Sequence, residues 1–91
     1  MEIIILDFTN CKYYMEVYHI IKEAYSLPEY FGNNLSALWD CLRDFFIEDM
    51  HTKIVGLNTL PKDLREYMNR ILEVFDDVHK ENPNMTFEVI S

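Results

Sequence analysis

Acidic side chains recur at helical spacing in two parts of this 91-residue sequence. Asp40 and Asp44 are four residues apart, which places both carboxylates on one face of a helix. Carboxylates grouped in this way can work as a general acid and base, accept hydrogen bonds from a cationic partner, or simply solvate a helix face. A second group shares one side of a later helical stretch: Glu73, Asp76, Asp77 and Glu81.

The other chemistry-bearing residues form no catalytic or metal-binding pattern. The sequence has no glycine-rich phosphate loop, no Cys-x-x-Cys and no nucleophile elbow. His19, His51 and His79 lack the spacing of a zinc site, so we expect surface histidines. Cys41 lies near the apolar edge of its helix, where a small buried thiol is expected. A carboxylate pair would also need a cleft, so a small hydrolase is disfavoured, and we expect neither enzyme activity nor a metal or cofactor.

The charge balance excludes some partners. Sixteen acidic and eight basic residues give a net charge of −8. This charge repels nucleic acid and anionic membranes and suits a cationic protein. Solubility alone is the competing explanation for the acidity.

The expected compartment is the cytoplasm. Two cysteines, Cys11 and Cys41, are too few for a secreted disulfide scaffold and are expected to be reduced. The first residues have no basic region, and their apolar run is too short for a signal peptide. No apolar stretch approaches the ~20 residues of a membrane span.

Three apolar stripes at spacings of three and four predict amphipathic helices. The first covers residues 14–24 and must end near Leu27, because the residue before a proline avoids the helical conformation. The second covers residues 35–45. The third covers residues 60–78, with a proline in its first turn, and the pattern leaves open whether Lys62 begins this helix or an extra turn before it.

Three strands complete the fold. Ile3–Leu6 is a continuous apolar run, typical of a parallel strand covered on both faces. Lys53–Leu57 and Met85–Ile90 are the other strand candidates. The order β-α-α-β-α-β, with helical crossovers, predicts an α/β fold with a small three-stranded parallel sheet packed by helices. We expect one domain over residues 1–91.

A loop rich in aromatic residues separates the first two helices. Tyr30 and Phe31 lie in it, and Gly32 offers conformational freedom. Asn34 is a favoured N-cap for the next helix, and Trp39 follows about one turn later. These residues form either a binding surface beside the acids of the second helix or, alternatively, a plug that fixes the loop to the core.

The segment Leu27–Leu42, LPEYFGNNLSALWDCL, closely resembles the signature of the barstar family. The family pattern is Leu-Pro-x-Tyr-[Tyr/Phe]-Gly-x-Asn-Leu-[Asp/Ser]-Ala-Leu-x-Asp, and the match has no gap. Residues 71–75 resemble the family's last helix and residues 86–91 its final strand, so the resemblance covers the whole chain. It implies a three-stranded parallel sheet packed by helices. It also implies a bacterial intracellular inhibitor that protects its cell from a ribonuclease.

The resemblance assigns roles to individual residues. Asp40 matches a central carboxylate that would replace the scissile phosphate of RNA and accept hydrogen bonds from Arg and His of the enzyme. Tyr30 matches an aromatic residue that covers the catalytic histidine, and Asp77 matches a glutamate that reaches a basic residue at the rim. The predicted partner-binding set is Tyr30, Phe31, Gly32, Asn34, Ser36, Trp39, Asp40, Asp44, Glu73 and Asp77.

Two members of this set depart from the family pattern. Ser36 stands where the best-known member has an aspartate, which removes one phosphate mimic. Asp77 is one methylene shorter than the usual glutamate. Two targets therefore remain open: a basic, extracellular-type, barnase-like ribonuclease, or a different toxin countered by an immunity protein of the same fold. For either target we expect a toxin–antitoxin relationship, a free monomer, and no nucleic-acid or membrane partner.

Overall fold

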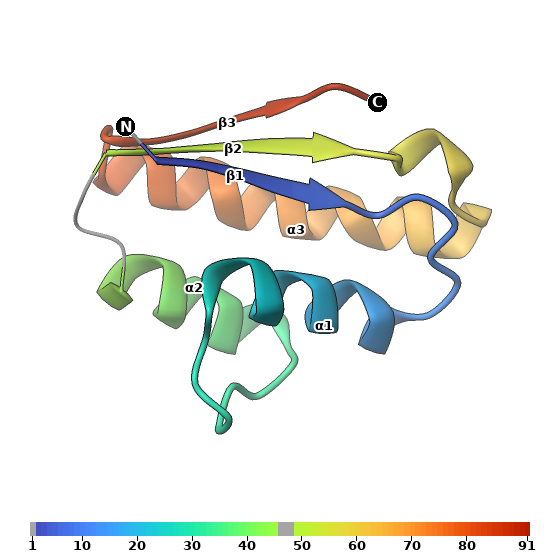
Figure 1. The fold of residues 1–91 in the computed structure, drawn as a ribbon, viewed down its shortest axis with the longest axis horizontal. Coiled ribbons are helices and arrows are strands. Elements are labelled where there is room, and N and C mark those ends of the chain that lie inside the picture. Colours follow the sequence, from blue (N-terminus) through green and yellow to red (C-terminus); the bar gives the residue numbers. More distant parts are fainter. Residues whose placement is uncertain (1, 46–48) are drawn as a thin grey trace.

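The computed structural model describes residues 2–45 and 49–91. Within these residues, three parallel strands form one sheet in the order β1-β2-β3 (Figure 1). The strands are β1 (Glu2–Asp7), β2 (Met50–Val55) and β3 (Met85–Val89).

Three α-helices connect the strands. The order is β-α-α-β-α-β, as predicted, and the helices are α1 (Tyr14–Tyr25), α2 (Leu35–Phe45) and α3 (Lys62–Glu81). A short 3-10 turn, Leu57–Thr59, precedes α3, so an extra turn does come before the last helix. None of the helices in the described residues is both long and apolar enough to cross a membrane.

All three helices cover the same face of the sheet (Figure 1). Both crossovers move in one direction across the sheet, and right-handed crossovers then place every helix on one side. Leu6 and Thr52 point into this layer and are fully buried. Ile3 and Ile5 lie on the other face and are 55% and 60% exposed. The expectation of a first strand covered on both faces is therefore wrong, because an apolar run does not show how many layers cover a strand.

The second strand begins and ends earlier than predicted. It covers Met50–Val55 instead of residues 53–57. Its buried positions include the polar Thr52, which hid the alternation in the sequence. The strand stops because Gly56 has a φ of 89° and its N–H donates to the Ser91 carbonyl at 2.6 Å.

Gly56 is expected to resist substitution. A Cβ at this position would lie 2.4 Å from the Thr9 backbone nitrogen, and the left-handed conformation itself costs a non-glycine residue about 1–2 kcal/mol. Gly56→Ala should therefore lower the free energy of unfolding by more than about 2 kcal/mol in urea titrations. Asn58→Ala, at an exposed neighbour, is the matched control and should change stability little. Equal losses in the two variants would contradict the proposed strain.

The core lies between the sheet and the helices. Each predicted helical stripe contributes side chains to the core. Tyr14, the first residue of its stripe, is half exposed, and its ring centre lies 4.4 Å from that of Tyr67. On α1 and α3, Tyr18 and Tyr67 also share a hydrogen bond between their hydroxyls. The fully buried apolar side chains include Leu6, Phe8, Val17, Ile21, Leu38, Leu42, Ile54, Ile71, Phe75 and Val78.

A buried hydrogen bond joins α1 to β2. The Tyr25 hydroxyl and Thr52 Oγ1 are 2.5 Å apart, and both side chains are buried. Burial raises the pKa of Tyr25 above its ordinary value of 10.0, and the bond to Thr52 opposes this rise in part. The folded protein thus keeps this proton at a pH where the unfolded chain loses it. The resulting stability is fully present below pH 10 and is lost as the pH rises further.

Tyr25→Phe tests this linkage. At pH 7 the variant should lose about 1–2 kcal/mol, because Thr52 keeps a buried hydroxyl without this partner. Above pH 10 its stability should fall less steeply than that of the unsubstituted protein. Urea titrations at a series of pH values measure both effects. Tyr30→Phe, at an 81% exposed position, is the control, and an identical alkaline slope in all three proteins would refute the prediction.

Candidate partner-binding site

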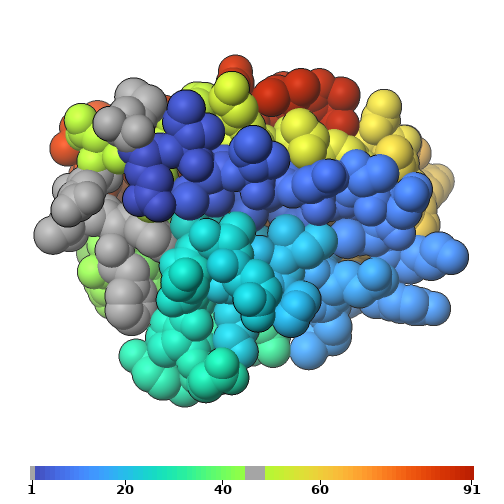
Figure 2. All heavy atoms as spheres, in the orientation of Figure 1, coloured from blue at the N-terminus to red at the C-terminus, as the bar shows by residue number. Residues whose placement is uncertain are grey.

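The loop between α1 and α2 projects from the body of the molecule (Figures 1 and 2). Phe31 anchors it, because its ring is buried and meets Tyr18 edge-on with the ring centres 6.0 Å apart. Lys22 on α1 adds an ion pair to Glu29 of the loop at 3.0 Å. The structure therefore places Phe31 in the core, where it fixes the loop, and not on the surface with the rest of the predicted set.

Tyr30, the neighbour of Phe31, points the other way. Its side chain is 81% exposed, the most exposed of the large apolar or aromatic side chains in the described residues. An aromatic ring held out on an anchored loop can bury much surface in a complex without first leaving a core.

Asn34 connects this loop to α2. Its Oδ1 accepts a hydrogen bond from the Ala37 N–H at 2.8 Å, which is the N-cap predicted from the sequence. Its Nδ2 also donates to the Gly32 carbonyl at 3.0 Å. Gly32 is exposed to solvent, but the space beside its Cα is narrow. A Cβ added there would lie 3.1 Å from Asn34 Nδ2. These contacts fix the direction in which α2 leaves the loop.

A shallow hollow of about 420 Å³ lies where α2 meets α3. Ser36 and Asp40 are exposed at its rim, and Trp39 and Leu35 are half-buried along it. Val74 closes it from α3. Residues almost forty positions apart in the sequence thus form one surface around Asp40.

Arg43 lies beside this hollow and was not singled out in the sequence analysis. Its guanidinium carbon is 4.2 Å from the centre of the Trp39 ring. Its Nε is 2.8 Å from Glu81 Oε2. The four-residue spacing from Trp39 to Arg43 is a signal that could have found the first contact, but the pairing with α3 needs the tertiary structure.

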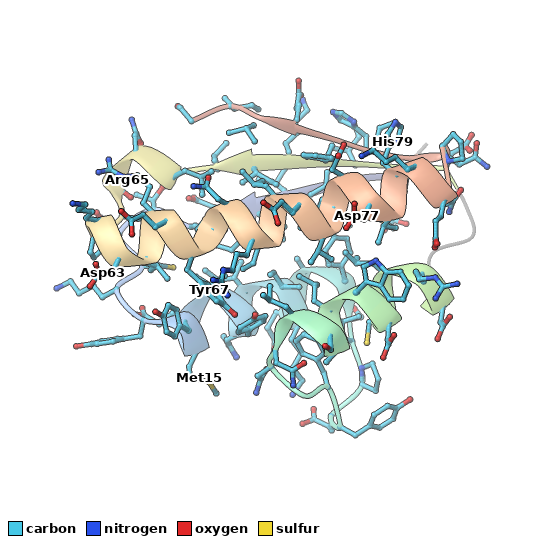
Figure 3. The ribbon with its side chains drawn as sticks, turned by 180° about the vertical axis from the view of Figure 1, so that it is seen from behind. Met15, Asp63, Arg65, Tyr67, Asp77 and His79 are labelled. Carbon is cyan, nitrogen blue, oxygen red and sulfur yellow. The ribbon has the colours of Figure 1, made fainter. Side chains whose placement is uncertain are left out.

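The four acids that were predicted to share one side of α3 separate into two kinds. Asp76 pairs with Lys80 at 3.1 Å, which raises the pKa of that lysine, and Glu81 pairs with Arg43. Glu73 and Asp77 are exposed, and Figure 3 shows Asp77 on the outer surface of α3. Asp77 follows Val74 by three residues, which places it along the side of α3 that borders the hollow.

The four carboxylates of the predicted binding set have no ion-pair partner in the described residues, a property that they share with other acids such as Asp63 and Glu66. Within residues 2–45 and 49–91, no basic nitrogen lies within 4.0 Å of any of them. Each is exposed and so can accept hydrogen bonds from an incoming cation at no cost in existing ion pairs. These carboxylates are Asp40, Asp44, Glu73 and Asp77.

The neighbouring thiol lies in surroundings that disfavour its ionised form. Cys41 is buried, and this burial together with the adjacent Asp40 and Asp44 raises its pKa. The thiolate that a nucleophile needs is therefore disfavoured. Of the predicted surface histidines, His51 and His79 are half-buried instead. His51 bonds Thr86 at 2.7 Å, and His79 bonds the Met85 carbonyl at 2.7 Å, so both have structural partners.

Comparisons with known proteins agree with this architecture. A family model described as "Barstar (barnase inhibitor)" matches residues 1–90. The chain is also 32% identical over 76 residues to a protein of Bacillus subtilis (strain 168) named "Putative ribonuclease inhibitor YrdF". That match covers 82% of this chain and 79% of the relative. With its β-α-α-β-α-β order and a family match over nearly its whole length, this chain belongs to the barstar family.

Proposed function

We propose that this chain inhibits a barnase-like ribonuclease by placing carboxylates in its active site where RNA phosphate would bind. The observation that carries the proposal is Asp40. Its carboxylate is exposed, has no ion-pair partner in the described residues, and stands at the rim of the hollow between α2 and α3. The family match and the relative named as a ribonuclease inhibitor support the same role.

The chemistry of the inhibition is substitution of one anion for another. A ribonuclease binds the scissile phosphate with Arg, Lys and His donors, and a carboxylate offers those donors similar acceptors. Asp40 would occupy the central position. Asp44 on the same helix, together with Glu73 and Asp77 on α3, would meet basic groups at the edge of the enzyme's active site.

The remaining binding residues supply contact area and rigidity. Tyr30 would lay its exposed ring on the enzyme's catalytic histidine. Trp39 and Ser36 would meet the enzyme around the hollow. Because Asn34 caps α2 and Phe31 anchors the loop, this surface is ordered before binding, which reduces the entropy lost in the complex.

The inhibitor is proposed to work as a cytoplasmic monomer, with one domain over residues 1–91 and no catalytic activity. Its net charge of −8 would speed encounter with a basic enzyme, and added salt should slow that association.

An immunity protein against a different toxin is the second candidate. Ser36 favours this candidate, because it presents an exposed hydroxyl where the best-known family member has an aspartate. A toxin that fits this surface would not need a cation opposite this position. Purification of the complex from the source cell, followed by identification of the captured enzyme, would separate the two candidates.

The decisive experiment measures RNA cleavage. A purified barnase-like ribonuclease is mixed with increasing amounts of the protein, and inhibition should be complete near equimolar ratio. Full ribonuclease activity at micromolar excess of the protein would refute the proposed partner. RNA turnover by the protein alone would instead support the disfavoured hydrolase.

A further inference from the structure

Arg43 is a positive charge within the acidic surface of α2. It follows Asp40 by three residues and precedes Asp44 by one, and all three side chains are exposed. Residues three and four apart on a helix are neighbours. The guanidinium therefore neighbours the Asp40 carboxylate that is proposed to enter the ribonuclease.

Contacts from two helices hold this guanidinium in place. The centre of the Trp39 ring of α2 lies 4.2 Å from its central carbon, and Glu81 of α3 forms an ion pair with its Nε at 2.8 Å. Stacking on an indole and pairing with a carboxylate each restrict a side chain that is otherwise flexible. Arg43 is thus positioned before any partner arrives, and less entropy is lost when one binds.

The guanidinium keeps hydrogen-bonding capacity for a further acceptor. A single carboxylate cannot use every N–H donor of an arginine, and the Arg43 side chain remains 44% exposed. Glu81 is its one ion-pair partner in the described part of the chain. The free donors form a planar fork, which suits a second carboxylate.

A cation at this place discriminates between enzymes. An enzyme with Lys or Arg opposite Arg43 would bring like charges together at the interface, which is strongly unfavourable. An enzyme with Asp or Glu there would gain a charge-assisted hydrogen bond. Resting on the proposed function, we infer that Arg43 is a specificity-determining residue, which selects ribonucleases that carry a carboxylate opposite the Trp39–Arg43–Glu81 cluster.

The test uses the barnase-like ribonuclease of the inhibition assay. Arg43→Gln should weaken inhibition about tenfold, and Arg43→Glu should weaken it further. Arg65→Gln is the matched control, because it removes the same charge from an exposed position at the opposite end of α3 from Asp77 (Figure 3). The control should change the inhibition constant less than about twofold, through long-range steering alone.

A charge exchange separates recognition from a structural role of Arg43. Exposed acidic residues around the enzyme's active site are replaced one at a time by Lys, and one replacement should restore inhibition by the Arg43→Glu variant. If Arg43→Glu weakened inhibition only because the Trp39 ring lost its contact with Arg43, a new lysine on the enzyme would not restore inhibition.

The outcomes distinguish this inference from the proposed function. If the unsubstituted protein inhibits but Arg43→Gln inhibits equally well or better, the role of Arg43 is refuted and the proposed function stands. Absence of rescue by every acid-to-Lys replacement would also refute it. If the unsubstituted protein fails to inhibit, both proposals fall.

Discussion

Asp40→Ala is expected to weaken inhibition of a barnase-like ribonuclease by at least about thirtyfold. Truncation of one member of a buried, hydrogen-bonded charge pair at protein interfaces, barnase–barstar among them, costs about 2–5 kcal/mol. The loss is large because the enzyme's cations would stay desolvated with no acceptor. Titration of ribonuclease activity with the variant, under the conditions used for the unsubstituted protein, gives the change in inhibition constant.

Asp63→Ala is the matched control for this prediction. Asp63 is also an exposed helical aspartate, so its removal changes net charge equally, but it lies at the opposite end of α3 from Asp77 (Figure 3). It should change the inhibition constant only slightly, by weaker steering. Equal effects of the two substitutions would refute the proposed interface. Circular dichroism of both variants checks that each one is folded.

Phe75→Ala is expected to lower the free energy of unfolding by about 3–5 kcal/mol. Phe75 is fully buried on α3, and its ring centre lies 5.6 Å from that of Phe87 on β3 and 6.5 Å from that of Tyr25 on α1. The truncation would leave a cavity where helix and sheet meet. Since small domains have only about 5–15 kcal/mol of stability, the variant should be close to unfolding at room temperature.

Phe75→Leu separates the cavity from other effects of this substitution. Leucine keeps most of the apolar volume and should cost less than about half as much as alanine. Urea titrations of both variants provide the comparison. A loss below about 1 kcal/mol in Phe75→Ala would contradict the central place of this ring in the core.

The secondary structure was largely predictable because helices leave a local record. Apolar stripes at spacings of three and four identified all three helices, and Asn34 was recognised as an N-cap from its residue type alone. The strands were less certain. Thr52 is polar, so the sequence did not indicate that it occupies a buried position of β2. Its burial is possible because its hydroxyl forms a hydrogen bond with Tyr25, which is distant in sequence.

The exposure of individual side chains could not be predicted in the same way. Tyr30 and Phe31 are adjacent aromatic residues, and the sequence offered binding or packing for both. The structure buries Phe31 against Tyr18 and leaves Tyr30 81% exposed. That division depends on how the loop meets α1, which local sequence does not encode.

By itself, the sequence determined the family, the order of the elements and the positions of the acids. These features are local: a contiguous signature, apolar periodicity and the place of each carboxylate on its own helix. Only the tertiary structure decided which acids are unpaired. It joined Glu81 to Arg43 across α2 and α3 and left Asp40 and Asp77 without ion-pair partners in the described residues. The physical reason is that an ion pair depends on distance in space, and helix packing brings together side chains that the chain keeps far apart.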